Sequence, residues 1–261
     1  MTPTDIALLI LGGLSSGLLA GLLGIGGGVL MVPLLLLLGF TIDQATATSL
    51  LAILVTASTG SWQNWHMGYL QPRQVLWLAA PAAILVIAGT ETGSLMTDIQ
   101  RQVGFGCLLL ANLYLVSIKK KAVAQTPQKP AQLNPTTARL VTGGTAGFMA
   151  GLFGVGGGVI MVPLQILLLG TGIKDAVRNS LGVIVITSLV ACIHNLVKGD
   201  IVPLAGLIMG LGGLVGAQIS TRFLPKLPAQ IISVLFRLLL FILATYTFWQ
   251  ALSTSKNLQK S

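Results

Sequence analysis

An eighteen-residue apolar segment occurs twice in the chain. Residues Gly17–Leu34 read GLLAGLLGIGGGVLMVPL, and residues Gly147–Leu164 read GFMAGLFGVGGGVIMVPL. Thirteen of the eighteen positions are identical, and the other five exchange one apolar residue for another. Each copy contains three consecutive glycines, and each glycine destabilises a helix by about 1 kcal/mol relative to alanine. The repeat therefore predicts two related halves, each with a helix that breaks at the same place.

The amino-acid composition indicates whether these helices are surrounded by water or by lipid. Hydrophobic residues make up 54% of the 261 residues and charged residues only 8%, whereas soluble domains carry roughly 25% charged residues. The apolar runs are continuous and do not alternate with polar residues, which favours membrane-spanning helices over strands. The net charge of +9 lies mostly between these runs. It indicates membrane topology and lipid headgroups, with no nucleic-acid partner.

The apolar runs predict an all-α polytopic membrane protein with about eight transmembrane helices in two four-helix repeats, each with a glycine-broken first helix. The N-terminal repeat covers residues 1–118, and the C-terminal repeat covers residues 140–252. Residues 119–139 read KKKAVAQTPQKPAQLNPTTAR, which predicts a basic linker between the repeats. Residues 253–261 are predicted to form a polar tail.

The direction of the two repeats depends on the segments after the glycine breaks. Four spans in each repeat would run both repeats through the bilayer in the same direction, whereas short segments that cross separately would invert them. The sequence leaves both arrangements open. With eight spans, the termini and the linker share one side, which carries nine lysines and arginines against five on the other. This excess predicts cytoplasmic termini and a cytoplasmic linker in a multi-pass protein of the cell membrane.

The glycine breaks form the first candidate site. A helix that breaks at membrane depth leaves backbone groups that lipid cannot satisfy, so the break faces protein or a polar cavity. The helix that resumes presents free N–H groups and the positive end of its dipole to an anion. Alternatively, the glycines only permit close helix packing, which Gly17-x-x-x-Gly21 and Gly147-x-x-x-Gly151 also fit. The candidate substrate-binding glycines are Gly24, Gly26, Gly27, Gly28, Gly154, Gly156, Gly157 and Gly158.

Polar residues at the start of the span after each break form the second candidate site. Such residues could donate hydrogen bonds and one positive charge to an oxyanion, or they could cap helices and bond between them. The candidates are Thr48, Ser49, Arg178, Asn179 and Ser180.

Other kinds of site find little support in the sequence. Cys192 and His194 are too few to indicate a metal site. Neither glycine segment carries the Lys and Ser or Thr of a nucleotide-binding loop. No carboxylate lies securely within a span, so a membrane-embedded pair of carboxylates for hydrolysis or cation binding is not expected.

The doubled motif closely resembles the sulfite exporter TauE/SafE family of membrane permeases. The matching residues are the eight candidate glycines together with Pro33 and Pro163, and the resemblance covers nearly the whole chain. It implies a secondary transporter, and no enzyme or cofactor, that exports sulfite, sulfonates or related small organic acids. Its two repeats would alternate access to the site, driven by the substrate gradient or by proton coupling. A non-transporting assembly or sensor protein and an anion channel remain as alternatives. Substrate, direction, coupling ion and oligomeric state are left open.

Overall fold

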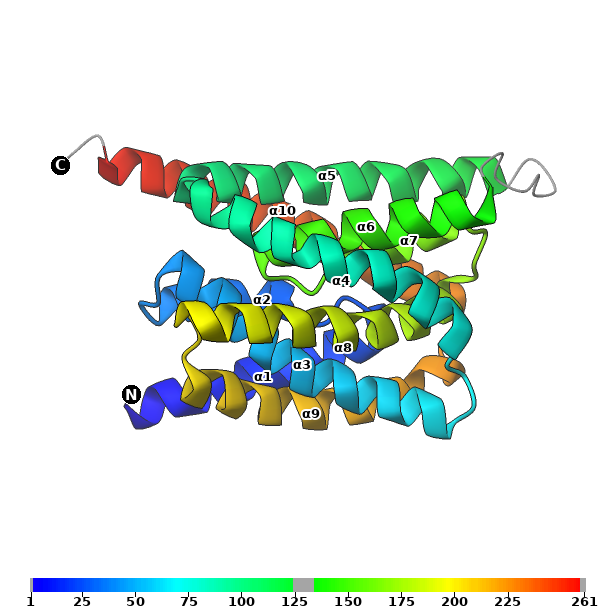
Figure 1. Ribbon diagram of the computed structural model, residues 1–261, viewed down its shortest axis with the longest axis horizontal. Helices are drawn as coiled ribbons and strands as arrows, with labels where there is room; N and C mark the ends of the chain where they lie inside the picture. Colours follow the sequence, from blue (N-terminus) through cyan, green and yellow to red (C-terminus); the bar gives the residue numbers. More distant parts are fainter. Residues whose placement is uncertain (1, 124–133, 259–261) are drawn as a thin grey trace.

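The computed structural model describes residues 2–123 and 134–258, and every regular element within them is helical (Figure 1). The N-terminal half contains α1 (Pro3–Leu23), α2 (Gly28–Leu37), α3 (Ile42–His66), α4 (Pro72–Leu95) and α5 (Asp98–Val123). The C-terminal half contains α6 (Pro135–Phe153), α7 (Gly158–Leu168), α8 (Ile173–Lys198), α9 (Pro203–Phe223), a 3-10 turn (Leu224–Lys226) and α10 (Ala229–Leu258).

The helices extend further than the sequence predicts at two places. The linker predicted over residues 119–139 is shorter in the structure, because α5 continues through the lysine cluster to Val123 and α6 already begins at Pro135. Residues 124–133 lie outside the described residues. The predicted polar tail is mostly helical, since α10 continues to Leu258.

The two halves have the same order of helices. α3, α4 and α5 begin at positions 42, 72 and 98, and α8, α9 and α10 begin at positions 173, 203 and 229, so one constant offset relates all three pairs. Local sequence explains several of these starts. Thr41 caps α3 by accepting the Gln44 backbone N–H, and a proline, which lacks the N–H that a first turn leaves unbonded, opens α4 and α9.

The first helix of each half breaks at the predicted glycines. α1 ends at Gly24 in the left-handed region, with φ 68°, and Gly26 and Gly27 also have positive φ before α2 begins. Residues other than glycine adopt this conformation only at an energetic cost. α2 then turns back along α1, because the Ser16 hydroxyl donates to the Gly27 carbonyl and Gly12 lies against Leu34. Each break is therefore the tip of a helical hairpin, since Gly157 lies against Ala146 in the same way.

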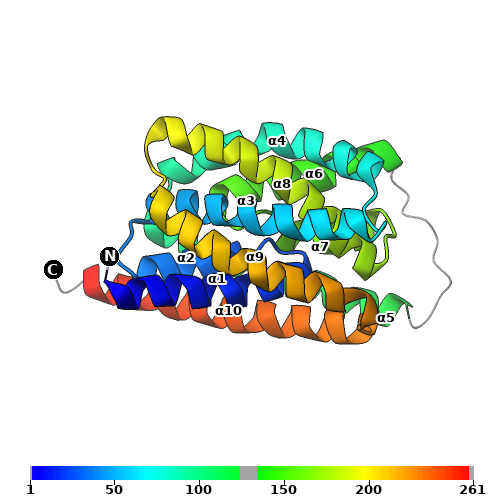
Figure 2. The same ribbon diagram turned by 90° about the horizontal axis from the view of Figure 1, so that it is seen from below.

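This hairpin makes the two halves inverted. α1 begins and α2 ends at one end of the bundle, after which α3, α4 and α5 cross it three times (Figures 1 and 2). α5 consequently ends, and α6 begins, at the end opposite to the start of α1 and the end of α10. The expectation that the linker shares the side of the termini is wrong. That prediction counted each broken helix as one membrane span. In the structure, α2 and α7 instead run back to the ends of the bundle where α1 and α6 begin.

Within the described residues, five helical segments are long and apolar enough to cross a membrane. They are α1, α4, α8, α9 continued to Lys226, and residues 229–247 of α10. A bilayer core of about 30 Å needs roughly 20 apolar residues in a helix. α3 has 25 residues and also runs from end to end of the bundle, but its Thr, Ser, Gln and Asn residues make it less apolar. The prediction of an all-helical membrane protein is confirmed, whereas the structure does not establish a count of eight spans.

The two halves interlock through close helix contacts. α1 packs along α9, and α4 packs along α6, so each pair joins helices from different halves. Methyl groups added to Gly17 and Gly147 would overlap the carbonyl oxygens of Gly213 and Ala82. The glycines that precede each break therefore serve helix packing, as the packing alternative expects for them.

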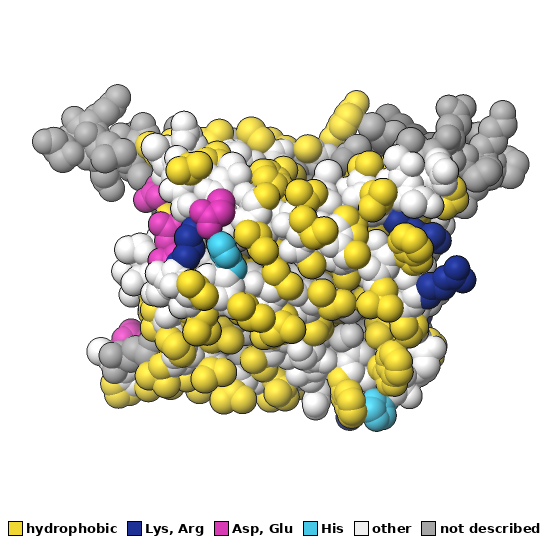
Figure 3. Space-filling view, viewed as in Figure 1, with side chains coloured by type: hydrophobic (Ala, Val, Ile, Leu, Met, Phe, Trp, Pro, Cys, Tyr) yellow, Lys and Arg dark blue, Asp and Glu magenta, His cyan; other side chains and the backbone are white. Residues whose placement is uncertain are grey.

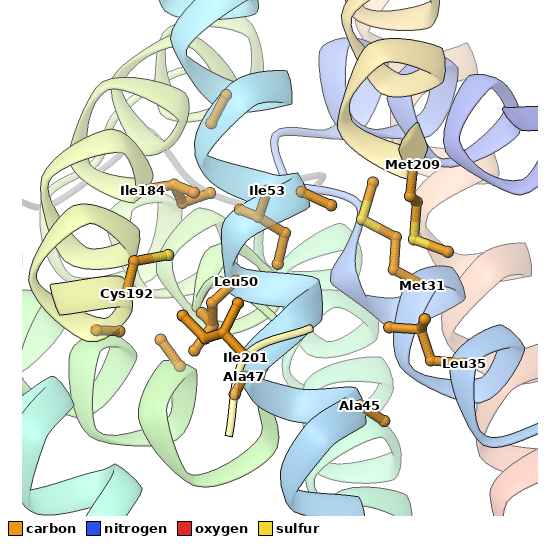
Figure 4. Packing of buried hydrophobic residues seen from close by; sticks show 14 of the residues in the cluster. Met31, Leu35, Ala45, Ala47, Leu50, Ile53, Ile184, Cys192, Ile201 and Met209 are labelled. Carbon is orange, nitrogen blue, oxygen red and sulfur yellow. The ribbon is translucent and has the colours of Figure 1, made fainter. Parts of the chain in front are cut away.

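A buried apolar cluster fills the space between α2, α3, α8 and α9. Met31, Ile53, Ile184 and Met209 are each at most 1% exposed, and they converge from these four helices (Figure 4). This cluster holds the hairpin tips in the interior.

Candidate functional site

The two glycine breaks meet inside the bundle. A methyl group on Gly28 would lie 2.7 Å from the Gly154 carbonyl oxygen, and a methyl group on Gly158 would overlap the Gly24 carbonyl oxygen. Side-chain bonds repeat this cross-connection. Ser49 Oγ donates to the Gly154 carbonyl at 2.8 Å, and Ser180 Oγ donates to the Gly24 carbonyl at 2.7 Å. Each half therefore binds the broken backbone of the other.

The place where the two glycine breaks meet is called the crossing below. Many backbone N–H groups at the crossing are unbonded. The N–H groups of residues 25–29 and 155–159 donate to no group in the described chain, although all ten residues are buried. An unbonded buried polar group costs about 1–3 kcal/mol. The first turns of α2 and α7 also carry the positive ends of their helix dipoles. The crossing thus concentrates donors and partial positive charge in the core.

Two isoleucines close one face of the crossing. Methyl groups on Gly26 and on Gly156 would each come within about 3.2 Å of Ile53 and 3.3–3.4 Å of Ile184. These side chains come from α3 and α8, and they lie close together in Figure 4. No room is left for a ligand on this face.

A cavity of about 50 Å³ lies beside the crossing. Its volume exceeds the roughly 10–15 Å³ that one water requires. Gly28 and Val29, at the start of α2, line it together with Val155 from the second break. The remaining lining residues are Val32, Pro33, Leu36, Ile42, Phe105 and Phe153, with four polar residues, Thr46, Arg101, Gln102 and Thr247.

Arg101 is the charged residue of this cavity. Its side chain is 4% exposed. Arg101 Nε donates to the Gly93 carbonyl at 2.7 Å, and Nη2 donates both to that carbonyl and to Asp43 Oδ1, the latter at 2.7 Å. The side chain of Asp43 is 48% exposed, so the ion pair extends from the interior to the end of the bundle where α3 begins.

A polar recess of about 10 Å³ lies on the other side of Arg101. Thr46 and Arg101 line both the recess and the cavity. Near the recess, Glu91 Oε1 on α4 contacts His194 Nε2 and Lys198 Nζ on α8, at 2.6 and 2.9 Å. Lys198 lines the recess together with Asp43, Thr90, Gly93, Ser94, Gly151, Leu152, Asn195 and Asp200.

The structure brings only some of the predicted polar residues to the breaks. Ser49 and Ser180 contact them directly, but Thr48 accepts the backbone N–H of Val202 at 3.0 Å, between α8 and α9. Arg178 bonds Asp175 at 3.0 Å and lies 3.9 Å over the Tyr69 ring. Asn179 is fully buried, and its side-chain amide makes no hydrogen bond to a described residue.

Sequence reasoning missed Arg101 and Gln102. Neither is among the site residues predicted from the sequence, because nothing nearby in the sequence indicates that α5 places Arg101 beside Gly28, a break residue much earlier in the chain. The useful signal is that Arg101 lies within the first turn of an otherwise apolar span, since an ionisable residue within a membrane segment indicates a function by default.

The metal alternative gains nothing from the structure. Among residues 2–123 and 134–258, no three His, Cys, Asp or Glu side chains gather where they could hold a metal ion. Cys192 is buried in the apolar cluster between α3 and α8, and His194 bonds Glu91.

Known proteins resemble this chain along almost its whole length. It is 25% identical to the "Probable membrane transporter protein YunE" of Bacillus subtilis (strain 168), over 95% of this chain and 99% of that protein. A "Probable membrane transporter protein" of Xylella fastidiosa (strain Temecula1 / ATCC 700964) is 27% identical, over 96% and 98%. Another of that name, from Haemophilus influenzae, is 33% identical over 68% of each chain. Residues 9–247 match the family described as sulfite exporter TauE/SafE, and the chain belongs to this family of membrane transporters.

Proposed function

We propose that this protein is a secondary transporter of small anions, with sulfite and sulfonates as the first substrates to test. The observation that carries the proposal is the meeting of two half-helix starts whose buried N–H groups have no acceptor in the described chain. An anion supplies the missing acceptors and gains from both dipoles. The description of the family as a sulfite exporter supports the substrate and the outward direction.

The inverted halves support a mechanism of alternating access. Two inverted repeats give a transporter two equivalent conformations, in which each half takes the arrangement of the other and the site opens to opposite sides. The hairpin tips belong to different halves and contact each other, so a movement of one half relative to the other changes the site directly. The substrate gradient or coupled protons would drive the cycle.

We infer that the termini lie outside the cytoplasm. Nine described lysines and arginines belong to the end where α5 ends and α6 begins, against three at the opposite end, Arg101, Lys198 and Lys256. The face in Figure 3 agrees, with acidic side chains gathered towards the end where α1 begins. Because cytoplasmic segments carry the excess of Lys and Arg, the α5–α6 end faces the cytoplasm. The nine residues are Arg73, Lys119, Lys120, Lys121, Arg139, Lys174, Arg178, Arg222 and Lys226.

A reporter pair tests this orientation in cells. Alkaline phosphatase fused after the C-terminus is expected to be active, and green fluorescent protein at the same position is expected to be dark. The opposite pattern would place the termini in the cytoplasm.

Sulfite flux into proteoliposomes tests the function. A transporter shows saturable flux that is stimulated by sulfite on the opposite side, a channel shows flux without saturation, and an assembly or sensor protein shows none. Gly156→Ala should abolish the flux, because the methyl group strains the backbone at φ 74° and presses on Ile53 and Ile184. Gly170→Ala is the matched control, since Gly170 has φ 66° but no heavy atom within 4 Å of the added methyl group.

Normal saturable flux in Gly156→Ala would show that the crossing is not the transport site. If the native protein moves neither sulfite nor any of a series of sulfonates and carboxylates, the proposal of anion transport is wrong.

A further inference from the structure

We propose that Arg101 binds the transported anion, in the cavity beside α2, and that Asp43 competes with the anion for it. This inference rests on the proposed anion transport and goes beyond it. It names the binding residue, and it places the charged residue of the site at only one of two positions that are equivalent in the two halves.

Three of the four polar residues that line the cavity belong to the N-terminal half of the pseudo-symmetric fold, and the charged residue, Arg101, is one of them. Because one constant offset relates α3, α4 and α5 to α8, α9 and α10, each of the four polar cavity residues has a counterpart that can be read from the sequence. The counterparts of Thr46, Arg101, Gln102 and Thr247 are Val177, Ile232, Ser233 and Val116. Ile232 is fully buried in an apolar cluster with Phe236 and Leu240. An anion therefore finds a full positive charge at only one of the two equivalent positions.

Arg101 retains hydrogen-bonding capacity for a ligand. A guanidinium group has five N–H donors, and three of them serve the Gly93 carbonyl and the Asp43 carboxylate, one from Nε and two from Nη2. Nη1 makes no hydrogen bond to any described residue, which leaves two donors. A planar guanidinium suits the paired oxygens of a sulfite or sulfonate. At 4% exposure, water screens such a contact weakly.

The neighbouring groups complete a site for an oxyanion. Gly28 and Val29 line the same cavity, and their unbonded N–H groups lie in the first turn of α2. Gln102 lines the cavity, and its buried Oε1 bonds no described residue. A half turn of the amide group would present its NH₂ group there instead. A protonated anion such as bisulfite could also donate to the amide oxygen.

Asp43 competes with the anion for Arg101. Arg101 and Thr46 line both the cavity and the recess, so an anion that arrives from the recess meets Arg101 first. In the recess, Asp43 Oδ1 accepts a hydrogen bond from Arg101 Nη2. Lys198 and Asp200 are the other charged side chains that line the recess. The Asp43 carboxylate lowers the positive potential at Arg101 and so weakens anion binding. Asp43 thus keeps the buried cation paired when the site is empty and helps to release the anion.

The test measures binding without transport. The melting temperature of the purified protein is recorded against sulfite, methanesulfonate and chloride, because a ligand that binds the native state raises this temperature. Arg101→Gln should weaken sulfite binding by about 10- to 100-fold, the range for one charged hydrogen bond. Arg101→Lys keeps the positive charge but loses the paired N–H donors of the planar guanidinium, and it should bind sulfite with intermediate affinity. Asp43→Asn should bind sulfite about two- to fivefold more tightly, as expected for the loss of a partly exposed ion pair.

Arg237→Gln is the matched control. Arg237 is a partly buried arginine of α10 that bonds Ser233 in its own helix and does not line the cavity. Its replacement should leave sulfite binding unchanged. The gain expected for Asp43→Asn keeps the test decisive even if Arg101→Gln does not fold, because a misfolded protein does not gain affinity.

The outcomes separate the two proposals. Saturable flux of the native protein, with unchanged sulfite binding in Arg101→Lys and Asp43→Asn, would overturn the role of Arg101 and leave anion transport standing. Stabilisation by sulfite that depends on Arg101, without flux, would support the binding site and contradict transport. If none of the three anions stabilises the native protein, the site proposed here is wrong.

Discussion

Ser49 Oγ lies 2.8 Å from the carbonyl oxygen of Gly154, 105 residues later in the chain. The counterpart bond joins Ser180 Oγ to the Gly24 carbonyl at 2.7 Å. Each serine belongs to the second helix after one break, α3 or α8, and donates to the carbonyl of the glycine that ends the first helix of the other half. The pair of bonds therefore joins the two hairpin tips across the pseudo-symmetry of the fold.

Replacing these serines should loosen the crossing. Ser49→Ala or Ser180→Ala leaves a buried carbonyl without its side-chain donor, and each is expected to reduce the unfolding free energy by about 1–3 kcal/mol. Thermal unfolding in detergent measures the effect. Thr92→Ala is the control, because exposed Thr92 bonds only its own helix. A serine variant as stable as this control would show that the cross-connection contributes nothing.

The hairpin can be tested by cross-linking. With Cys107 and Cys192 replaced by alanine, cysteines at Gly12 and Leu34 should form a disulfide under mild oxidation, because Gly12 lies against the Leu34 side chain. In a continuous helix, the two positions would lie about 33 Å apart, far beyond the reach of a disulfide. Absence of the cross-link, with both cysteines reactive to a maleimide, would contradict the hairpin.

Close packing of α1 on α9 predicts opposite results for two glycines of one helix. Gly17→Ala pushes a methyl group into the Gly213 backbone, and we expect a loss of about 1–3 kcal/mol, the range for overpacking. Gly12→Ala meets only the flexible end of Leu34 and should be close to neutral, since alanine also favours the helix. Melting temperatures of the two variants distinguish them, and equal losses would argue against the α1–α9 contact.

Arg178, which the sequence indicates as a site residue, should behave as a structural residue. Its guanidinium bonds Asp175 and stacks on Tyr69 at the α5–α6 end of the bundle. Arg178→Gln should lower the unfolding free energy by about 1–2 kcal/mol and leave the Michaelis constant for anion flux unchanged. A large rise in that constant, with stability retained, would return Arg178 to the site.

The class of the protein and the position of each break can be read from the amino-acid sequence alone. With 8% charged residues, these helices suit lipid better than water. The glycines at 24, 26 and 27 and at 154, 156 and 157 end a helix because they adopt positive φ, which is a property of the residues themselves. Ser49 and Ser180 can also be identified from the sequence, as polar residues near the start of the span that follows each break.

The path of the broken helices depends instead on packing between distant segments. Nothing in the repeated motif states that α2 turns back along α1, and this turn makes the halves inverted and moves the α5–α6 connection to the opposite end. Contacts across the chain also select which arginine reaches a break. Arg101 meets Asp43, 58 residues earlier, beside the start of α2, whereas Arg178, which is nearer in sequence to a break, stacks on Tyr69. Composition and local propensity are read along the chain, but the partners of a buried charge depend on which helices pack together.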